Sequence, residues 1–254
     1  MLFYFSATGI TKKWAHLIAD RIGEPVLDIE TELKKDNPEY ALKDDERIGF
    51  MCPVYFGDVP EIVRQFVEKI HVRTGEQYYC YIAMTYGSDS FYAPNRFMHL
   101  LLRHGLTTSA VFGIRGIDTF LPMFTIPTGS KRAQIEERAG VEAAFVAEQI
   151  FDRTVTTHLK RAPFPWLTTA CMTPVYAMMK NTRNFHVSES CTGCGLCERN
   201  CPVHAIKLDP ANQQPQWVLS KCMLCMRCLH NCPAEAIDYG RSTVGKLRYR
   251  VIDG

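Results

Sequence analysis

The feature that most constrains this chain is a cysteine motif that occurs twice near its C-terminal end. The segment SCTGCGLCERNCPVHAI, which begins at Ser190, recurs 31 residues later as KCMLCMRCLHNCPAEAI, which begins at Lys221. Each copy has the form C-x2-C-x2-C-x3-C-P, and the Ala-Ile pair that follows repeats in register. Eight of the eleven cysteines of the chain lie in these two copies. We therefore interpret the two copies as one duplicated structural unit.

This cysteine spacing is typical of ligands to iron-sulfur clusters. In each copy three closely spaced thiolates cap one face of a [4Fe-4S] cubane, and the fourth cysteine, which precedes a proline, ligates the other cluster. A zinc site built from C-x2-C pairs has no need of a third cysteine and a proline in each copy. The sequence therefore predicts two [4Fe-4S] clusters. Cluster I takes Cys191, Cys194, Cys197 and Cys232, and cluster II takes Cys222, Cys225, Cys228 and Cys201.

The N-terminal part of the chain, residues 1 to 155, alternates between strand and helix patterns. Short apolar segments predict five strands, at residues 2–5, 25–29, 48–52, 78–84 and 109–114. Apolar stripes predict helices that end at Gly23, open at Pro60, cover residues 94–104 and cover residues 131–153. Such alternation is typical of an α/β fold with a parallel sheet, which binds ligands at the carboxyl ends of its strands.

The loop after the first strand is rich in hydroxyl groups. It contains Ser6, Ala7, Thr8, Gly9, Ile10 and Thr11. Backbone N–H groups at the start of the following helix can bind a phosphate, because they point at the anion and the helix dipole favours it. The chain has no P-loop lysine at the required spacing and no G-x-G-x-x-G segment, so ATP and NAD are not favoured. A simple N-capped turn has much the same composition, so the loop alone leaves both interpretations open.

Aromatic residues follow the two strands that are predicted to lie beside the first one. The third strand runs into Pro53, Val54, Tyr55, Phe56 and Gly57, and the fourth runs into Thr85, Tyr86, Gly87, Ser88 and Asp89. The carboxyl ends of these strands meet at one edge of the sheet, where a flat ring system could be held. Edge packing of Tyr55 and Tyr86 against the sheet is the alternative.

Taken together, these motifs resemble those of known redox families. S-x-T-G-x-T after the first strand, P-x-Y-x-G after the third and T-Y-G after the fourth resemble flavodoxins over residues 1–155. That resemblance implies a sheet of order 2-1-3-4-5 and FMN, with its phosphate on residues 6–11 and its isoalloxazine against the other two loops. The cysteine segment resembles bacterial two-[4Fe-4S] ferredoxins. The whole chain resembles the flavodoxin/ferredoxin hybrids, or ferrodoxins, of anaerobic microorganisms.

We expect four segments along the chain. A flavodoxin-like FMN-binding domain (1–155) is followed by a linker (156–187), a small α+β ferredoxin domain with two clusters (188–240) and a basic tail (241–254). Residues 153–188 contain no acidic residue but do contain Arg153, Lys160, Arg161, Lys180 and Arg183. These cations could offset the charge of the clusters and the FMN phosphate, or form a docking surface for an acidic redox partner.

The charge balance and the N-terminal residues argue against a nucleic-acid-binding, exported or membrane-inserted protein. The chain has 29 Lys and Arg against 27 Asp and Glu, which does not favour a nucleic-acid partner. MLFYFSATG lacks a basic start and a cleavage-like end, and no long uninterrupted apolar segment is present. We expect no membrane insertion, reduced thiols and a cytoplasmic location. Cys52, Cys80 and Cys171 are interpreted as packing residues.

These observations favour an electron carrier or relay that moves low-potential electrons between FMN, two [4Fe-4S] clusters and external redox proteins. One alternative is an oxidoreductase in which the clusters feed an FMN that reduces a small substrate. Another is a redox-sensing or assembly module whose flavin pocket is empty. None of the eight histidines has a metal-like spacing, and no general acid and base pair is evident, so no catalytic residue is assigned.

Overall fold

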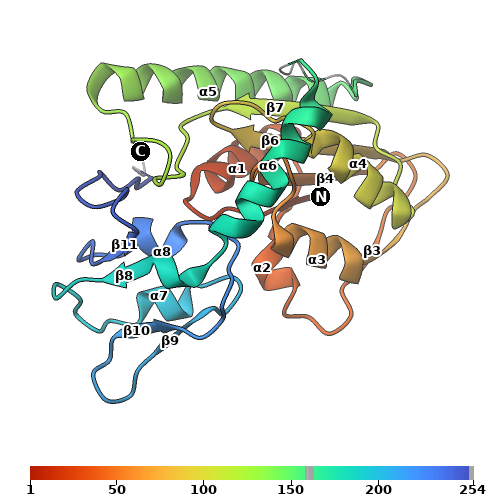
Figure 1. The fold of residues 1–254 in the computed structure, drawn as a ribbon. Coiled ribbons are helices and arrows are strands. Elements are labelled where there is room, and N and C mark those ends of the chain that lie inside the picture. Colours follow the sequence, from red (N-terminus) through yellow and green to blue (C-terminus); the bar gives the residue numbers. More distant parts are fainter. Residues whose placement is uncertain (158, 160–162, 252–254) are drawn as a thin grey trace.

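The computed structural model describes residues 1–157, 159 and 163–251. Its N-terminal part contains a five-stranded parallel sheet of order β2-β1-β4-β6-β7, which is the predicted order 2-1-3-4-5 (Figure 1). The strands are β1 (Leu2–Tyr4), β2 (Val26–Asp28), β4 (Arg47–Pro53), β6 (Tyr79–Tyr86) and β7 (Ala110–Arg115). The central strands are buried along nearly their whole length, as expected for a sheet covered on both faces. The predicted fold class is confirmed.

Helices cover both faces of this sheet. On one face lie α1 (Ile10–Ile22) and α5 (Gly129–Phe151), and on the other lie α3 (Glu61–Lys69) and α4 (Ala93–Arg103). Helix α1 ends where predicted, because Gly23 adopts a left-handed conformation and its N–H bonds to the Ala19 carbonyl. The two apolar layers between helices and sheet form the main core of the molecule.

Some short elements lie outside the predicted pattern. Helix α2 (Ile29–Glu32) directly follows β2, where the Asp28 side chain accepts hydrogen bonds from the N–H groups of Glu30 and Thr31. Strands β3 (Glu39–Ala41) and β5 (His71–Arg73) form a separate parallel pair. Each of these elements is only three or four residues long, which is too short to produce a recognisable apolar period.

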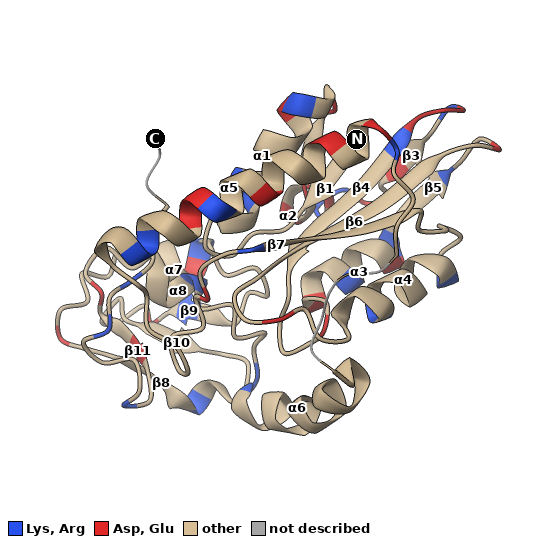
Figure 2. Ribbon diagram, turned by 90° about the horizontal axis from the view of Figure 1, so that it is seen from above, with Lys and Arg blue, Asp and Glu red and all other residues tan. Residues whose placement is uncertain are grey.

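A helix occupies much of the segment that the sequence predicts to be a linker. Helix α6 (Pro165–Met179) contains no charged residue and crosses the molecule beside the flavodoxin-like part (Figures 1 and 2). Thr169 is fully buried, and its hydroxyl oxygen accepts a hydrogen bond from the Tyr92 N–H at 3.2 Å. Of the predicted basic stretch, Lys160 and Arg161 lie outside the described residues. No helix in the described part of the chain could span a membrane.

The two cysteine motifs fold into a small unit next to the sheet. Short helices, α7 (Leu196–Arg199) and α8 (Arg227–His230), lie one in each motif. The strands form two antiparallel pairs, β8 (Phe185–Val187) with β11 (Ile237–Tyr239) and β9 (Ile206–Leu208) with β10 (Pro215–Trp217). Phe185 stacks on Trp217 with ring centroids 4.7 Å apart, and Tyr239 contacts Phe185 edge-on. A single-turn 3-10 helix (Thr182–Asn184) leads into this unit.

Candidate flavin pocket and cysteine clusters

A cavity of about 440 Å³ lies at the carboxyl ends of the sheet strands. The three loops predicted to bind a ligand meet there. The cavity is lined by Ala7, Thr8, Ile10 and Thr11 after β1, by Pro53 to Gly57 at the end of β4 and after it, and by Thr85 to Asp89 at the end of β6 and after it. Ser6 and Gly9 belong to the first loop but do not line the cavity; instead the Ser6 hydroxyl accepts a hydrogen bond from the Gly9 N–H at 3.1 Å.

The first loop is held in a fixed shape by its neighbours. Gly9 has a φ of 92°, and a Cβ atom placed on it would lie 2.4 Å from a methyl carbon of Val251, so only glycine fits. The hydroxyls of Thr11 and Thr85 are hydrogen-bonded at 2.7 Å, which ties the first loop to the third. Helix α1 begins at Ile10, so the unpaired N–H groups of its first turn lie at this end of the cavity.

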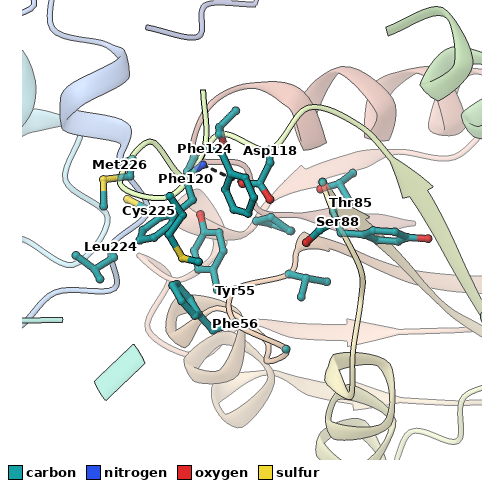
Figure 3. Close-up of a pocket in the computed structure, with 18 of the residues that line it drawn as sticks. Tyr55, Phe56, Thr85, Ser88, Asp118, Phe120, Phe124, Leu224, Cys225 and Met226 are labelled. Atoms are coloured by element: carbon teal, nitrogen blue, oxygen red, sulfur yellow. Dashed lines mark hydrogen bonds between the residues drawn. The ribbon is translucent and has the colours of Figure 1, made fainter. Parts of the chain in front are cut away.

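Aromatic rings form the middle of the cavity (Figure 3). Phe56 stacks on Tyr176 of helix α6 with centroids 4.5 Å apart, and it contacts Phe120 edge-on at 5.1 Å. The Tyr176 hydroxyl donates a hydrogen bond to the Met223 carbonyl at 2.7 Å, so helix α6 is joined to the second cysteine motif. Burial, with a contribution from the nearby Cys225 thiol, raises the pKa of Tyr55, which keeps its hydroxyl protonated.

Three parts of the cavity wall were not predicted from the sequence. They are the loop after β7 (Gly116 to Phe120, Met123 and Phe124), residues Cys171, Met172, Val175 and Tyr176 of helix α6, and residues Met223 to Met226 of the second cysteine motif. Phe91 also lines the cavity. The loop after β7 could have been found, because it follows a strand of the same parallel sheet. Helix α6 and the second cysteine motif reach the cavity only through tertiary packing, which no local sequence pattern indicates.

The loop after β7 adds a carboxyl group to the cavity. The Asp118 side chain accepts a hydrogen bond from the Phe120 N–H at 3.1 Å, as the dashed line in Figure 3 shows. Burial raises the pKa of Asp118 above its usual range, whereas that hydrogen bond acts in the opposite direction. Asp118 is therefore an acid placed in an otherwise largely apolar wall.

The eight cysteines of the two motifs gather in two groups. Those predicted for cluster I, Cys191, Cys194, Cys197 and Cys232, all line one small cavity of about 20 Å³. Among those predicted for cluster II, burial together with the nearby thiols of Cys222 and Cys201 raises the pKa of Cys225 to about 12. Each fourth cysteine thus lies near the three cysteines of the other copy.

The donor groups in both places fit iron-sulfur clusters. Backbone N–H groups already point at three of the sulfurs, from Ala205 to Cys201 at 3.2 Å, from Ala236 to Cys232 at 3.3 Å and from Leu224 to Cys222 at 3.4 Å. Such bonds stabilise negative charge on thiolate sulfur. Among the described residues no three His, Cys, Asp or Glu side chains converge closely enough for a single metal ion. A cubane, with iron at four corners, keeps its four thiolates farther apart than a single ion does.

The second cysteine group lies against the flavin pocket. Cys225 and its neighbours Leu224 and Met226 line one end of the cavity, and Thr85 and Ser88 line the other (Figure 3). The cavity is thus bounded by loops of the sheet on one side and by a cluster loop on the other. Its shape, its aromatic walls and the helix N-terminus at one end fit a flavin with a phosphate group.

Comparison with known protein families matches two separate parts of the chain. The model of a flavodoxin domain matches residues 1–93, and that of a 4Fe-4S dicluster domain matches residues 190–236. No curated protein matches the chain.

Several solved structures resemble part of the molecule. A candidate flavoprotein from Bacteroides uniformis has 14% identity and a TM-score of 0.34, over 54% of this chain and 94% of that one. The rubredoxin oxygen:oxidoreductase of the anaerobe Desulfovibrio gigas has 12% identity and a TM-score of 0.33, over 59% of this chain and 36% of that one. The Trp repressor binding protein of Bacillus subtilis has 9% identity and a TM-score of 0.35, over 57% of this chain and 97% of that one.

The two matched domains support a role in redox chemistry and electron transfer, with a flavin in one and iron-sulfur clusters in the other. The chain is a fusion of a flavodoxin domain with a 4Fe-4S dicluster ferredoxin domain.

Proposed function

We propose that this protein is an electron relay that carries FMN and two [4Fe-4S] clusters and exchanges low-potential electrons with other redox proteins. FMN would be bound by the loops 6–11, 53–57 and 85–89, and each cluster by three cysteines of one motif and the fourth of the other. The flavin exchanges one or two electrons and each cluster exchanges one, so the protein could interconvert electron pairs and single electrons.

The observation that carries this proposal is that Cys225 lines the same cavity as the three flavin loops. A cluster held by Cys225 would lie directly against the flavin site, with no intervening layer of protein. Tyr55 and Tyr176 line the cavity together with Cys225, and the Tyr176 hydroxyl donates a hydrogen bond to the Met223 carbonyl, so the aromatic wall and the cluster loop are in contact. The flavin would therefore exchange electrons first with cluster II.

FMN would be held by a domain of residues 1–155 and the clusters by a domain of residues 188–240. The intervening segment, 156–187, contains helix α6, which supplies Tyr176 to the aromatic wall of the cavity. We propose that this helix covers the flavin and shields it from small oxidants. Electrons would then leave through the clusters.

A test of the flavin site compares FMN with riboflavin. The wild-type protein should bind FMN far more tightly, because riboflavin lacks the phosphate that the helix α1 N-terminus would bind. Thr8→Ala combined with Thr11→Ala should weaken FMN binding by about 1.5 to 3 kcal/mol for each charge-assisted hydrogen bond lost. Flavin fluorescence titration under anaerobic conditions measures both effects. Thr74→Ala, an exposed threonine outside the cavity, is the control. Equal affinity for FMN and riboflavin would contradict the proposed phosphate site.

A second test separates a relay from an enzyme. The reduced protein should pass electrons quickly to a ferredoxin-type acceptor in anaerobic stopped-flow experiments, with little turnover of NAD(P)H or small organic acceptors. If Lys180 and Arg183 help to dock an acidic partner, the association rate should fall with salt, since the Debye length shrinks from about 30 Å at 0.01 M to about 10 Å at 0.1 M. Sustained turnover of a small substrate without a protein partner would favour the oxidoreductase instead.

A further inference from the structure

One arginine of the second cysteine motif contacts the first loop of the flavodoxin domain. The Arg227 guanidinium donates hydrogen bonds to the backbone carbonyl oxygens of Ser6 at 2.6 Å and Ala7 at 3.1 Å. It also pairs with Glu30, to which it donates at 2.7 Å through a second nitrogen. The Arg227 side chain is only 12% exposed, so these bonds are largely shielded from water.

The same side chain is fixed to the cluster loop at its other end. Arg227 lies between Cys225 and Cys228 in the sequence, and its guanidinium donates to the carbonyl oxygen of Asn200 at 3.1 Å. Asn200 directly precedes Cys201. Three of the four cysteines proposed for cluster II are therefore close in sequence to this contact. Cys225 and Cys228 lie within two residues of Arg227, and Cys201 follows Asn200.

The contacts of Arg227 set the direction of two backbone N–H groups. A trans peptide is planar and holds its N–H opposite to its C=O. The Ser6 carbonyl shares a peptide with the Ala7 N–H, and the Ala7 carbonyl shares one with the Thr8 N–H. Because Arg227 binds both carbonyls, both N–H groups point away from it. Ala7 and Thr8 both line the cavity. Their N–H groups donate to no other group in the described part of the chain.

Two further facts distinguish Arg227 from a direct flavin ligand and from a general part of the cysteine motif. It is not among the residues that line the cavity, so it does not itself reach the flavin site. In addition, the position that corresponds to it in the first copy of the motif is occupied by Leu196, so the cysteine motif does not require an arginine there.

We propose that Arg227 is a positioning residue that couples cluster II to the binding of the flavin phosphate. This inference rests on the function proposed above. The cluster orders the loop from Cys222 to Cys228, the loop fixes Arg227, and Arg227 aims the Ala7 and Thr8 N–H groups at the phosphate. Coupling between two binding sites is reciprocal, so each cofactor strengthens the binding of the other by the same factor.

The first experiment measures flavin affinity in Arg227→Gln and Arg227→Lys proteins that retain full iron and wild-type cluster spectra. FMN should bind Arg227→Gln about tenfold or more weakly, which corresponds to about 1.4 kcal/mol, whereas riboflavin affinity should not change. Arg227→Lys keeps the charge but not the fork of donors, and should recover part of the affinity. A merely structural role would weaken both flavins alike.

Arg248→Gln is the matched control. Arg248 is also a buried arginine that donates to backbone carbonyls, those of Ile237 at 3.0 Å and Thr243 at 3.1 Å, but Ile237 lies in the ferredoxin domain and Thr243 in the tail that follows it. Its substitution should leave the ratio of FMN to riboflavin affinity unchanged. An Arg227→Gln protein with intact clusters and wild-type FMN affinity would overturn the proposal.

A second experiment needs no variant. Iron release from the wild-type protein to a chelator should be slower for cluster II when FMN is bound, with no change for cluster I, as followed by EPR. If FMN has no effect on the loss of cluster II, the coupling is absent. If the wild-type protein does not prefer FMN to riboflavin, the proposed flavin site fails instead, so the two failures are distinguishable.

Discussion

The two copies of the cysteine motif share their spacing but differ in what surrounds them. In the first copy Cys194 is exposed, and its neighbours include Gly193 and Gly195, both with left-handed backbone. In the second copy the corresponding residues are Leu224 and Met226, which keep the same left-handed conformation although they are not glycine. Both side chains are almost fully buried and line the flavin cavity.

This difference shows how a duplicated unit becomes specialised. A non-glycine residue in left-handed backbone costs on the order of 1 to 3 kcal/mol. Burial of a large apolar side chain contributes about 1.5 to 3 kcal/mol. In the second copy the two effects are of similar size, so the strained loop is tolerated because its side chains are buried in the wall of the cavity. Gly193 and Gly195 of the first copy are not among the described residues that line this cavity, and glycine avoids the strain there.

The largest expected effect comes from removing the fourth cysteine of each copy. Cys201→Ala should abolish cluster II and leave cluster I, whereas Cys232→Ala should do the reverse, because each of these thiols lies near the other copy. Iron analysis and EPR of the reduced proteins distinguish the two. Only Cys201→Ala should also weaken FMN binding, since only cluster II adjoins the cavity. Loss of the cluster of the same copy would refute the crossed ligation.

A smaller effect concerns access from solvent. An added chelator or ferricyanide should destroy cluster I several-fold faster than cluster II, because Cys194 is exposed, whereas Cys225 is only partly exposed and lines the cavity that helix α6 and the sheet loops also line. Visible absorbance and EPR, recorded during anaerobic exposure to limiting reagent, follow each cluster. Equal rates would show that the second copy is no better shielded than the first.

The smallest expected effect concerns Gly193 of the first copy and the corresponding Leu224 of the second copy. Gly193→Ala should destabilise the ferredoxin domain by about 1 to 2 kcal/mol, because the residue has a φ of 66° and its new Cβ would lie 2.9 Å from the Gln213 side chain. Leu224→Gly should relieve strain but lose buried surface, with a smaller net loss. The two variants are compared by the urea concentration at which half of the cluster absorbance is lost. A larger loss for Leu224→Gly would mean that packing far outweighs strain.

Much of the flavodoxin domain could be predicted because its signals are local. Helix α1 ends at Gly23 and helix α3 begins after Pro60, as their terminal residues indicate. The strand order also followed from the resemblance. The loops after β1, β4 and β6 were predicted to meet, and nearly all their residues line the cavity.

The remaining parts of the site depend on contacts that are distant in the sequence. Helix α6 lies in the segment 156–187, which was predicted to be a linker, and its sequence contains Pro165 and Pro174. In the structure Pro165 stands in the first turn, where it is tolerated, and Thr169 is buried against Tyr92. Nothing around Arg227 in the sequence indicates that its partners are Ser6 and Ala7.

The span of the Arg227 contacts bears on how the protein matures during synthesis. Arg227 and the carbonyl of Ser6 are 221 residues apart in the chain. At about 5 to 20 residues per second, the ribosome needs roughly 10 to 40 seconds to add the arginine after it has made the loop. The flavodoxin domain can fold in that interval, but its loop would lack its final anchor. With the proposed role of Arg227, FMN would reach full affinity only after the last part of the chain has been made and has acquired iron and sulfide.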